Sequence, residues 1–215
     1  MKLISKDYED GYHERFLYNE VANSQRNRAR LQLLMDHIPG GNLLEIGCGK
    51  GGLLDLARAH YEIEGIDISR HAIQSIRGQF GDRVRVANIE WSPLPSRRFD
   101  VIAAFNILEH LKRPDRALVK IYQALRGGGI LAGSVPYNAG LVGRIVTRIG
   151  NFIDRTHVST LPPDAWMRIF NHIGFHKVTF FGEIPFGRNH CRYLYGSHWP
   201  HFAFNLMFIC QKAGE

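Results

Sequence analysis

The residues best suited to chemistry in this chain surround a glycine-rich turn. Glu45 ends an apolar run, and the turn that follows carries Gly47, Gly49 and Gly51 before a helix-like stretch. Glycine permits sharp turns and a close approach of backbone to ligand, and the first N–H groups of the next helix face the same place. Asp67 ends the following apolar run, where a carboxylate can accept hydrogen bonds from ribose hydroxyls. This order of parts predicts a cradle for a nucleotide-type cofactor.

The charge at this turn helps to choose between two cofactors. The spacing Gly47-x-Gly49-x-x-Gly52 also fits a dinucleotide pattern. A carboxylate at Glu45 would face a pyrophosphate with like charge, whereas it suits a ligand that carries an ammonium or a sulfonium. S-adenosylmethionine carries both cations and no phosphate. The run Glu45-x-Gly47-x-Gly49-x-Gly51 resembles the first motif of class I S-adenosylmethionine-dependent methyltransferases.

The resemblance to this family continues in order over about residues 40–180. The matching segments are residues 65–69 (the ribose-binding motif), 87–118 (the adenine loop, the fourth strand and the segment after it), 125–136 (the fifth strand) and 154–175. The last of these holds Asp154-x-Thr156-His157 and a helix that closes on Gly-Phe, as in many small bacterial members. The resemblance implies S-adenosylmethionine as the cofactor.

The remaining cofactor contacts follow from the rule that ligands lie at the carboxyl ends of the strands. Family members usually carry an Asp for the adenine amino group, where this chain has Asn88, whose side-chain oxygen can accept the same hydrogen bond. An ordinary turn residue is the alternative for Asn88. Ile89 is expected on the adenine face, with Glu90 as a second acceptor. The expected cofactor-binding residues are Glu45, Gly47, Cys48, Gly49, Gly51, Asp67, Ile68, Asn88, Ile89, Glu90, Phe105 and Asn106.

Three residues are candidates for catalysis at the acceptor. Transfer from a sulfonium needs alignment, plus a base where the acceptor is a hydroxyl or a protonated amine. His110 and His157 are the candidate bases because histidine titrates near neutral pH, and Glu109 stands beside His110. Asp154 could orient His157. In the alternative reading, Glu109 is a surface acid and both histidines are structural.

The same stretch bears on metal binding. In some methyltransferases a Glu-x-x-Glu-His run holds a divalent ion that orients a hydroxyl and lowers its pKa. This chain reads Asn106-x-x-Glu109-His110 and lacks the first carboxylate. We therefore expect no metal.

Alternating strand-like and helix-like stretches predict the fold that positions these residues. Strands are expected at 42–46, 62–66, 83–87, 99–105 and 129–134, and helices at 12–37, 51–59, 70–79 and 114–126. The pattern predicts an α/β fold: a single doubly wound Rossmann-like domain with helices on both faces. The apolar runs 176–184 and 201–210 lack an intervening helix, so they should pair antiparallel. The resemblance implies a seven-stranded, mostly parallel sheet with an antiparallel last strand.

Within one domain over residues 1–215, we expect four regions. They are an N-terminal helical cap (1–39), a cofactor-binding core (40–135), a lid or insertion helices (136–175) and C-terminal strands with a substrate-loop insertion (176–215).

Two segments should select the acceptor. Residues 138–155 carry an apolar stripe at helical spacing, made of Leu141, Ile145, Ile149 and Phe152. With Arg144 and Arg148 beside it, the stripe could form a lid or contact a membrane surface, although packing on its own domain is the commoner outcome. Residues 185–202 are rich in aromatic and histidine side chains and would line the acceptor pocket, with candidates His190, Tyr193, Tyr195 and His198.

Length, charge and cysteine content limit the other classes of function. The 215 residues fit one domain with a full core, and no run reaches the roughly 20 apolar residues of a bilayer span. No signal-peptide pattern opens the chain, so we expect a cytoplasmic protein. Three cysteines without zinc spacing, Cys48, Cys191 and Cys210, argue against both a zinc site and a disulfide framework.

The formal charge of +7 favours an acidic partner. The arginines that contribute to this charge include Arg26, Arg28 and Arg30, which precede the first expected strand. Because no RNA-reading pattern with interleaved aromatics occurs, we expect a small-molecule acceptor, an acidic one being favoured, and no nucleic acid. The expected function is an S-adenosylmethionine-dependent O- or N-methyltransferase, with lipid or sugar intermediates among the acceptors. The alternatives are an RNA or protein methyltransferase, an NAD-linked oxidoreductase and a non-catalytic cofactor-binding protein.

Overall fold

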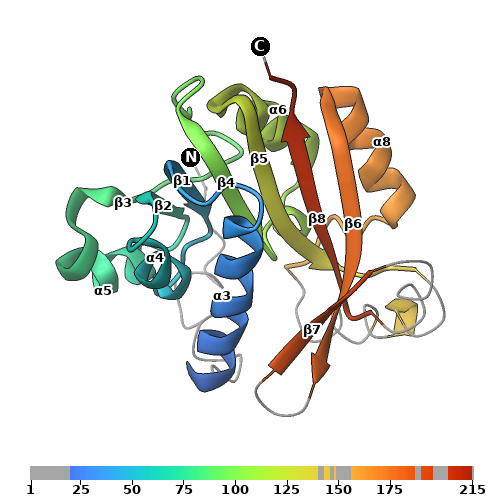
Figure 1. The fold of residues 1–215 in the computed structure, drawn as a ribbon, viewed down its shortest axis with the longest axis horizontal. Helices are drawn as coiled ribbons and strands as arrows, with labels where there is room; N and C mark the ends of the chain where they lie inside the picture. Colours follow the sequence, from blue (N-terminus) through green and yellow to red (C-terminus); the bar gives the residue numbers. More distant parts are fainter. Residues whose placement is uncertain are drawn as a thin grey trace.

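A mixed sheet in the order β3-β2-β1-β4-β5-β8-β6-β7 organises the molecule (Figure 1). The computed structural model describes residues 20–139, 143–145, 148, 156–186, 190–195 and 203–214. Within them the strands are β1 (Asn42–Ile46), β2 (Glu62–Asp67), β3 (Val84–Val86), β4 (Phe99–Phe105), β5 (Leu125–Pro136), β6 (Phe175–Phe186), β7 (His190–Leu194) and β8 (Asn205–Lys212). The first five strands run parallel, whereas β8 is antiparallel to both β5 and β6. The predicted α/β class and the antiparallel end of the sheet are confirmed.

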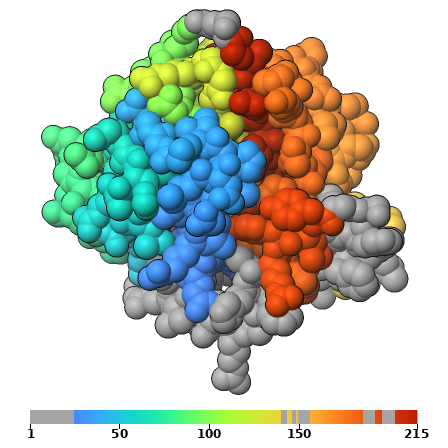
Figure 2. Space-filling model, in the orientation of Figure 1, coloured from blue at the N-terminus to red at the C-terminus, as the bar shows by residue number. Residues whose placement is uncertain are grey.

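Helices cover both faces of the sheet. They are α3 (Glu20–Met35), α4 (Gly52–Ala57), α5 (Arg70–Phe80), α6 (Pro114–Ala124) and α8 (Pro163–Ile173), with short 3-10 turns η1 (Gly81–Arg83) and η2 (Leu108–His110). Apolar residues of α3, α4 and α5 form one core cluster with the sheet, and those of α6 and α8 form the other. In Figures 1 and 2, α3 lies across the front of the sheet, where it packs against α4 on one side and β7 on the other.

Local sequence explains several element boundaries. Ser69 caps α5 by accepting a hydrogen bond from Ala72 N at 3.1 Å. Pro163 begins α8, and Gly174 ends it in a left-handed conformation at φ 109°, as expected for a helix that closes on Gly-Phe. The first helix is described only from Glu20, so the predicted residues 12–19 lie outside the described part.

The number of strands is the main departure from the expected sheet. The described residues form eight strands rather than seven, because His190–Leu194 pairs antiparallel with β6 as an edge strand. This strand lies inside the segment 185–202, where a loop was expected. No helix in the described residues is long and apolar enough to cross a bilayer.

Candidate functional site

The glycine turn connects β1 to α4 at the carboxyl edge of the sheet. Gly47, Gly49 and Gly51 all take left-handed conformations, with φ of 76°, 49° and 73°. The backbone N–H of Gly47 donates to the carbonyl of Ile66 on β2 at 2.7 Å. A Cβ atom on Gly47 would lie 2.0 Å from Cδ1 of Ile107, so glycine is required there for space as well as for conformation.

Asp67 fastens the turn to β2. Its Oδ2 accepts from Gly49 N and its Oδ1 from Ser69 N, both at 2.8 Å, and the residue is only 8% exposed. Each carboxylate oxygen keeps a second lone pair for a ribose hydroxyl. Ile68, next in the chain, is partly buried. The sequence analysis assigned Asp67 to the ligand alone and missed this structural role.

The predicted adenine loop is organised by its own hydrogen bonds. The oxygen of Asn88 that was expected to meet adenine already accepts from Glu90 N at 2.9 Å, which is the turn role held as the alternative. Ile89 is buried in the core cluster on the α6 side. Glu90 Oε1 accepts from Arg113 N at 2.9 Å, just before α6. These residues shape the loop, and their ligand contacts stay a prediction.

Glu45 lies buried below the turn, with 7% exposure. Its Oε2 has no hydrogen-bond partner among the described atoms. The pKa of Glu45 is raised to about 8, mainly by burial. Within this net shift, the charge of Arg30 lowers the pKa and that of Asp67 raises it. Burial also raises the pKa of the Cys48 thiol, with Glu45 and Asp67 adding to the effect. Cys48 is therefore a poor nucleophile and fills space against Gly65.

Phe105 ends β4, and Asn106 is the first residue after it. The ring of Phe105 lies under the guanidinium of Arg30, whose Cζ is 4.5 Å from the ring centroid. Asn106 is left-handed at φ 56°, and its Oδ1 accepts from Ser134 Oγ at 2.7 Å. This bond ties the end of β4 to β5, and the next residue, Ile107, then packs against Gly47.

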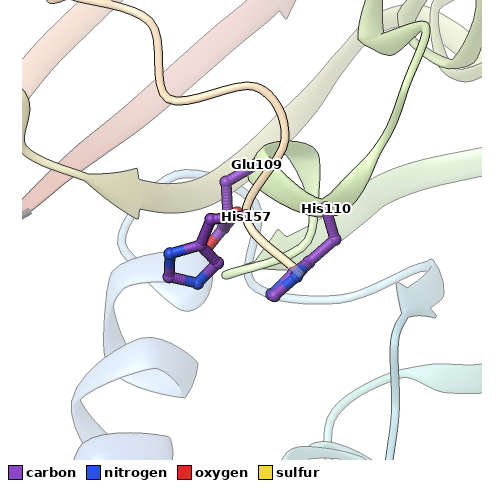
Figure 3. Close-up of side chains that lie close together, drawn as sticks. All are labelled: Glu109, His110 and His157. Atoms are coloured by element: carbon purple, nitrogen blue, oxygen red, sulfur yellow. The ribbon is translucent and has the colours of Figure 1, made fainter. Parts of the chain in front are cut away.

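Glu109 and His110 are neighbours in η2, and His157 lies beside them although it is far away in the sequence (Figure 3). The carbonyl of Glu109 accepts from the backbone N–H groups of Val158 and Ser159, both at 2.9 Å, which docks residues 156–160 onto η2. The rings of His110 and His157 meet edge to face, with centroids 4.8 Å apart. Glu109 is 1% exposed, which excludes the surface-acid reading. Asp154 lies outside the described residues.

The trio could also hold a metal ion. Its ligand atoms all lie within 4.8 Å of one another. Two imidazoles and a carboxylate are a common ligand set for zinc or iron, with ligands about 2.0–2.2 Å from zinc. Ligands at that distance are at most about 4.4 Å apart, so the group would have to close slightly around an ion. The structure thus offers a ligand set that the sequence analysis did not assemble.

A charged cluster under α3 was also missed. Arg26 and Arg30 were assigned to a basic field, yet both turn toward the sheet. Arg26 Nε lies 3.8 Å from Oε1 of Glu183, which is 2% exposed on β6. Asn205 Nδ2 donates to Glu183 Oε2 at 2.6 Å. A lone acid in the apolar run of β6 and two arginines one helical turn apart were the available signals.

The two acceptor-selecting segments are described in part. Tyr193 on β7 packs edge to face on Phe181 at 5.4 Å, and exposed Tyr195 stacks on the same ring at 4.9 Å. Ile145 is exposed within a short helical stretch. The other candidates, His198, Leu141, Ile149, Phe152 and the side chain of His190, lie outside the described part.

The fold is that of a Rossmann-like protein, and comparison with known proteins identifies the family. The model of the family called methyltransferase domain matches residues 14–179, more than half of the chain. The chain therefore belongs to the methyltransferase domain family.

Curated relatives and solved structures agree with this assignment. A probable S-adenosylmethionine-dependent methyltransferase of Mycobacterium tuberculosis is 32% identical over 115 residues, which are 52% of this chain and 42% of the relative. A ubiquinone biosynthesis O-methyltransferase of Coxiella burnetii is 30% identical over 114 residues, 49% of this chain and 48% of the relative. The chain thus spans less than half the length of these curated relatives.

The fold itself is similar to that of a crystal structure of a SAM-dependent methyltransferase from Archaeoglobus fulgidus. The TM-score is 0.72 at 20% identity, over 93% of this chain and 100% of that one. The cofactor in the names of these relatives is S-adenosylmethionine, and the assignment of the glycine turn to it stays a prediction.

Proposed function

We propose that this chain transfers a methyl group from S-adenosylmethionine to an oxygen or nitrogen of a small molecule. The observation that carries the proposal is the convergence of Glu109, His110 and His157 directly after Ile107, the residue that packs on the cofactor turn. Residues able to take a proton thus come directly after the residue that contacts the glycine turn, which places them next to the proposed cofactor site.

The chain's own residues fit the cofactor at three points. The left-handed glycine turn leaves backbone room, the Asp67 carboxylate has lone pairs for ribose hydroxyls, and buried Glu45 offers an oxygen for a cation. When bound, S-adenosylmethionine supplies a methyl group already activated on a sulfonium. The protein then has to align the acceptor and accept its proton.

His110 and His157 are the residues proposed for the proton. His110 Nδ1 and Thr156 Oγ1 form a hydrogen bond of 2.9 Å. When Nδ1 donates in this bond, Nε2 carries the lone pair that can take a proton from the acceptor. Buried Glu109 beside the rings would stabilise the imidazolium that forms.

The acceptor class is proposed from charge and from the relatives. The Coxiella burnetii relative is named as an O-methyltransferase in ubiquinone biosynthesis, which supports a small hydroxyl-bearing acceptor. An acidic acceptor would be attracted by the net charge of +7 and by the exposed arginines Arg144 and Arg148, which belong to the acceptor-selecting segment 138–155. Arg26 and Arg30 should contribute less to this field, because Glu183 partly offsets their charges.

The test is a methyl-transfer assay with a panel of phenols, carboxylic acids and amines, with formation of S-adenosylhomocysteine as the readout. His110→Asn and His157→Asn should lower turnover at least tenfold while cofactor affinity stays within twofold. His172→Gln, on the exposed surface of α8, is the matched control and should behave as wild type. Full turnover in both site variants would refute the assigned role. Methylated RNA or protein would favour the alternative acceptors, and bound cofactor without any product would favour a non-catalytic protein.

A further inference from the structure

A groove runs between α6 and α8, on the face of the sheet opposite α3 (Figure 1). Its volume is about 720 Å³, which lies within the range of roughly 300–1,000 Å³ that is typical of small-molecule sites. The residues that line it lie between Asp115 and Lys120 on α6 and between Arg168 and Ile173 on α8. The groove therefore shares no residue with the glycine turn or with the histidine–glutamate trio.

The floor of the groove is aliphatic and consists of Val119, Ile169 and Ile173. Val119 on α6 is 42% exposed. Ile169 and Ile173 on α8 are partly buried and pack against the core cluster on this side of the sheet. Covering exposed aliphatic surface removes it from water, which is favourable. The floor therefore favours a ligand with an apolar body.

The acids at the groove are already matched by arginines. Arg113 Nη2 lies 2.8 Å from Asp115 Oδ2, and its hydrogen bonds lower the pKa of Asp115. On α8, Arg168 Nη1 lies 2.9 Å from Asp164 Oδ2. Because each acid has its own cation, neither offsets the remaining positive charge of the groove.

The two remaining cations, Arg116 and Lys120, have no acid beside them. The side chain of Arg116 is exposed and pairs with no acid in the described part of the chain. The Lys120 ammonium donates to the carbonyls of Ile89, Glu90 and Ser92, at 3.3, 2.8 and 3.2 Å. Lys120 thus adds charge to the groove, while Arg116 has donors to offer. A carboxylate matches these donors because its two oxygens fit the planar guanidinium.

The length of the groove distinguishes a small ligand from a docked helix. The lining positions span six residues of each helix, or about 9 Å of helix axis at 1.5 Å per residue. The apolar stripe of a docked helix, from i to i+7, needs about 10.5 Å, with its acidic flanks in addition. A helix would extend beyond the groove, whereas a small molecule of matching volume lies within it.

We propose that the groove between α6 and α8 binds a small, free amphiphile, an alkyl or aryl carboxylate. The apolar body covers the aliphatic floor, and the carboxylate pairs with Arg116. This inference goes beyond the proposed function, because it adds a second ligand site away from the residues proposed for methyl transfer.

Titration calorimetry with three probes tests the charge assignment. Octanoate has both groups, 1-octanol has the apolar body alone, and acetate has the carboxylate alone. Octanoate should bind at one site and more tightly than 1-octanol, and acetate should not bind. Arg116→Gln should weaken octanoate by about 3- to 10-fold and leave 1-octanol within twofold. Arg85→Gln, which removes an exposed charge on β3, is the matched control and should bind octanoate as wild type.

A second pair of variants tests the aliphatic floor. Val119→Ser should weaken both octanoate and 1-octanol by about 3- to 10-fold, because it removes apolar contact from both. Val86→Ser, at a valine of β3 that is 43% exposed, is the matched control. His110→Asn should bind octanoate as wild type, so failure of the proposed base and failure of the groove site are distinguishable.

Several outcomes would overturn the proposal. They are no octanoate binding at millimolar concentration, equal affinity for octanoate and 1-octanol, and octanoate affinity that neither Arg116→Gln nor Val119→Ser changes. Sedimentation of the ligand-free protein tests the other occupants. A dimer that Val119→Ser dissociates would assign the groove to a second copy of the chain, and displacement of octanoate by an acidic helical peptide would assign it to a partner helix.

Discussion

Replacing Glu45 with Gln should remove a pH dependence from cofactor binding. In the ligand-free protein, burial raises the pKa of Glu45 from 4.5 to about 8, so the carboxyl group is largely protonated at neutral pH. A cofactor ammonium needs the carboxylate form. Binding below pH 8 must therefore release a proton, and affinity should rise by up to about tenfold per pH unit between pH 5.5 and 7.5. The titratable groups that interact with this carboxyl group are Arg30, Asp67 and Cys48, and the backbone of Leu54 forms a hydrogen bond that lowers its pKa.

The same shift predicts a stability effect of definite sign. Because the folded pKa lies above the unfolded one, Glu45 contributes stability below pH 4.5, and this contribution is lost as pH rises through about 8. At about 1.4 kcal/mol per unit, the full loss is roughly 5 kcal/mol. Glu45→Gln stays neutral, so it should unfold at higher urea concentration than wild type at pH 8.5 and at a similar concentration at pH 4.5.

The assay is titration calorimetry with S-adenosylhomocysteine at pH 5.5, 6.5 and 7.5, each in two buffers that differ in ionisation enthalpy. The wild type should release close to one proton at the lower pH values, and Glu45→Gln none. Glu62→Gln, an exposed acid on β2, is the control and should keep the wild-type slope. A flat wild-type profile, or an unchanged slope in Glu45→Gln, would refute the reasoning.

Three further predictions concern the turn and the acceptor groups. Gly47→Ala places a Cβ atom 2.0 Å from Cδ1 of Ile107 at a residue with φ of 76°, so it should lower the free energy of unfolding by about 1–3 kcal/mol and abolish cofactor binding. Gly78→Ala, on the open surface of α5, is the control and should leave thermal stability unchanged or raise it. Asp67→Asn leaves one acceptor oxygen for the two N–H groups of Gly49 and Ser69, and should weaken 5′-methylthioadenosine, which lacks the ammonium and carboxylate groups, as strongly as S-adenosylhomocysteine, since the loss is at the ribose end. If the histidine–glutamate trio acts as base rather than as metal ligands, dialysis against a chelator should leave turnover unchanged; recovery of lost turnover by added Zn²⁺, Mn²⁺ or Mg²⁺ would instead establish a metal site.

The sequence predicted those parts of the fold and site that depend on local signals. The left-handed glycines, the acids at the ends of β1 and β2 and the closing Gly174 each have a conformational or chemical requirement that can be read from neighbouring residues. The antiparallel end of the sheet followed from two apolar runs without a helix between them. These features need only periodicity and turn chemistry.

Long-range packing accounts for what the sequence did not reveal. The side chain of Arg30 turns inward because α3 lies across the sheet and brings it close to Glu183 on β6. No local sequence pattern predicts that these two residues are close in space. The docking of His157 on η2 depends on backbone bonds to Glu109, which carry no side-chain signal. Strand β7 pairs at an edge beside aromatic and histidine residues that equally suit a loop.

The charges around the cofactor cradle give a reason for its choice of ligand. With every group ionised, Glu45, Asp67 and Glu183 face Arg26 and Arg30, which leaves one negative charge in excess. In the ligand-free protein the raised pKa of Glu45 removes that excess by holding a proton. A ligand with one net positive charge, as S-adenosylmethionine has, can replace the proton and leave the site neutral, whereas a pyrophosphate would add two negative charges to it. In the proposed reaction, S-adenosylhomocysteine still holds Glu45 ionised through its ammonium but lacks the sulfonium charge, so its complex keeps one negative charge in excess and the product is released more easily than the donor.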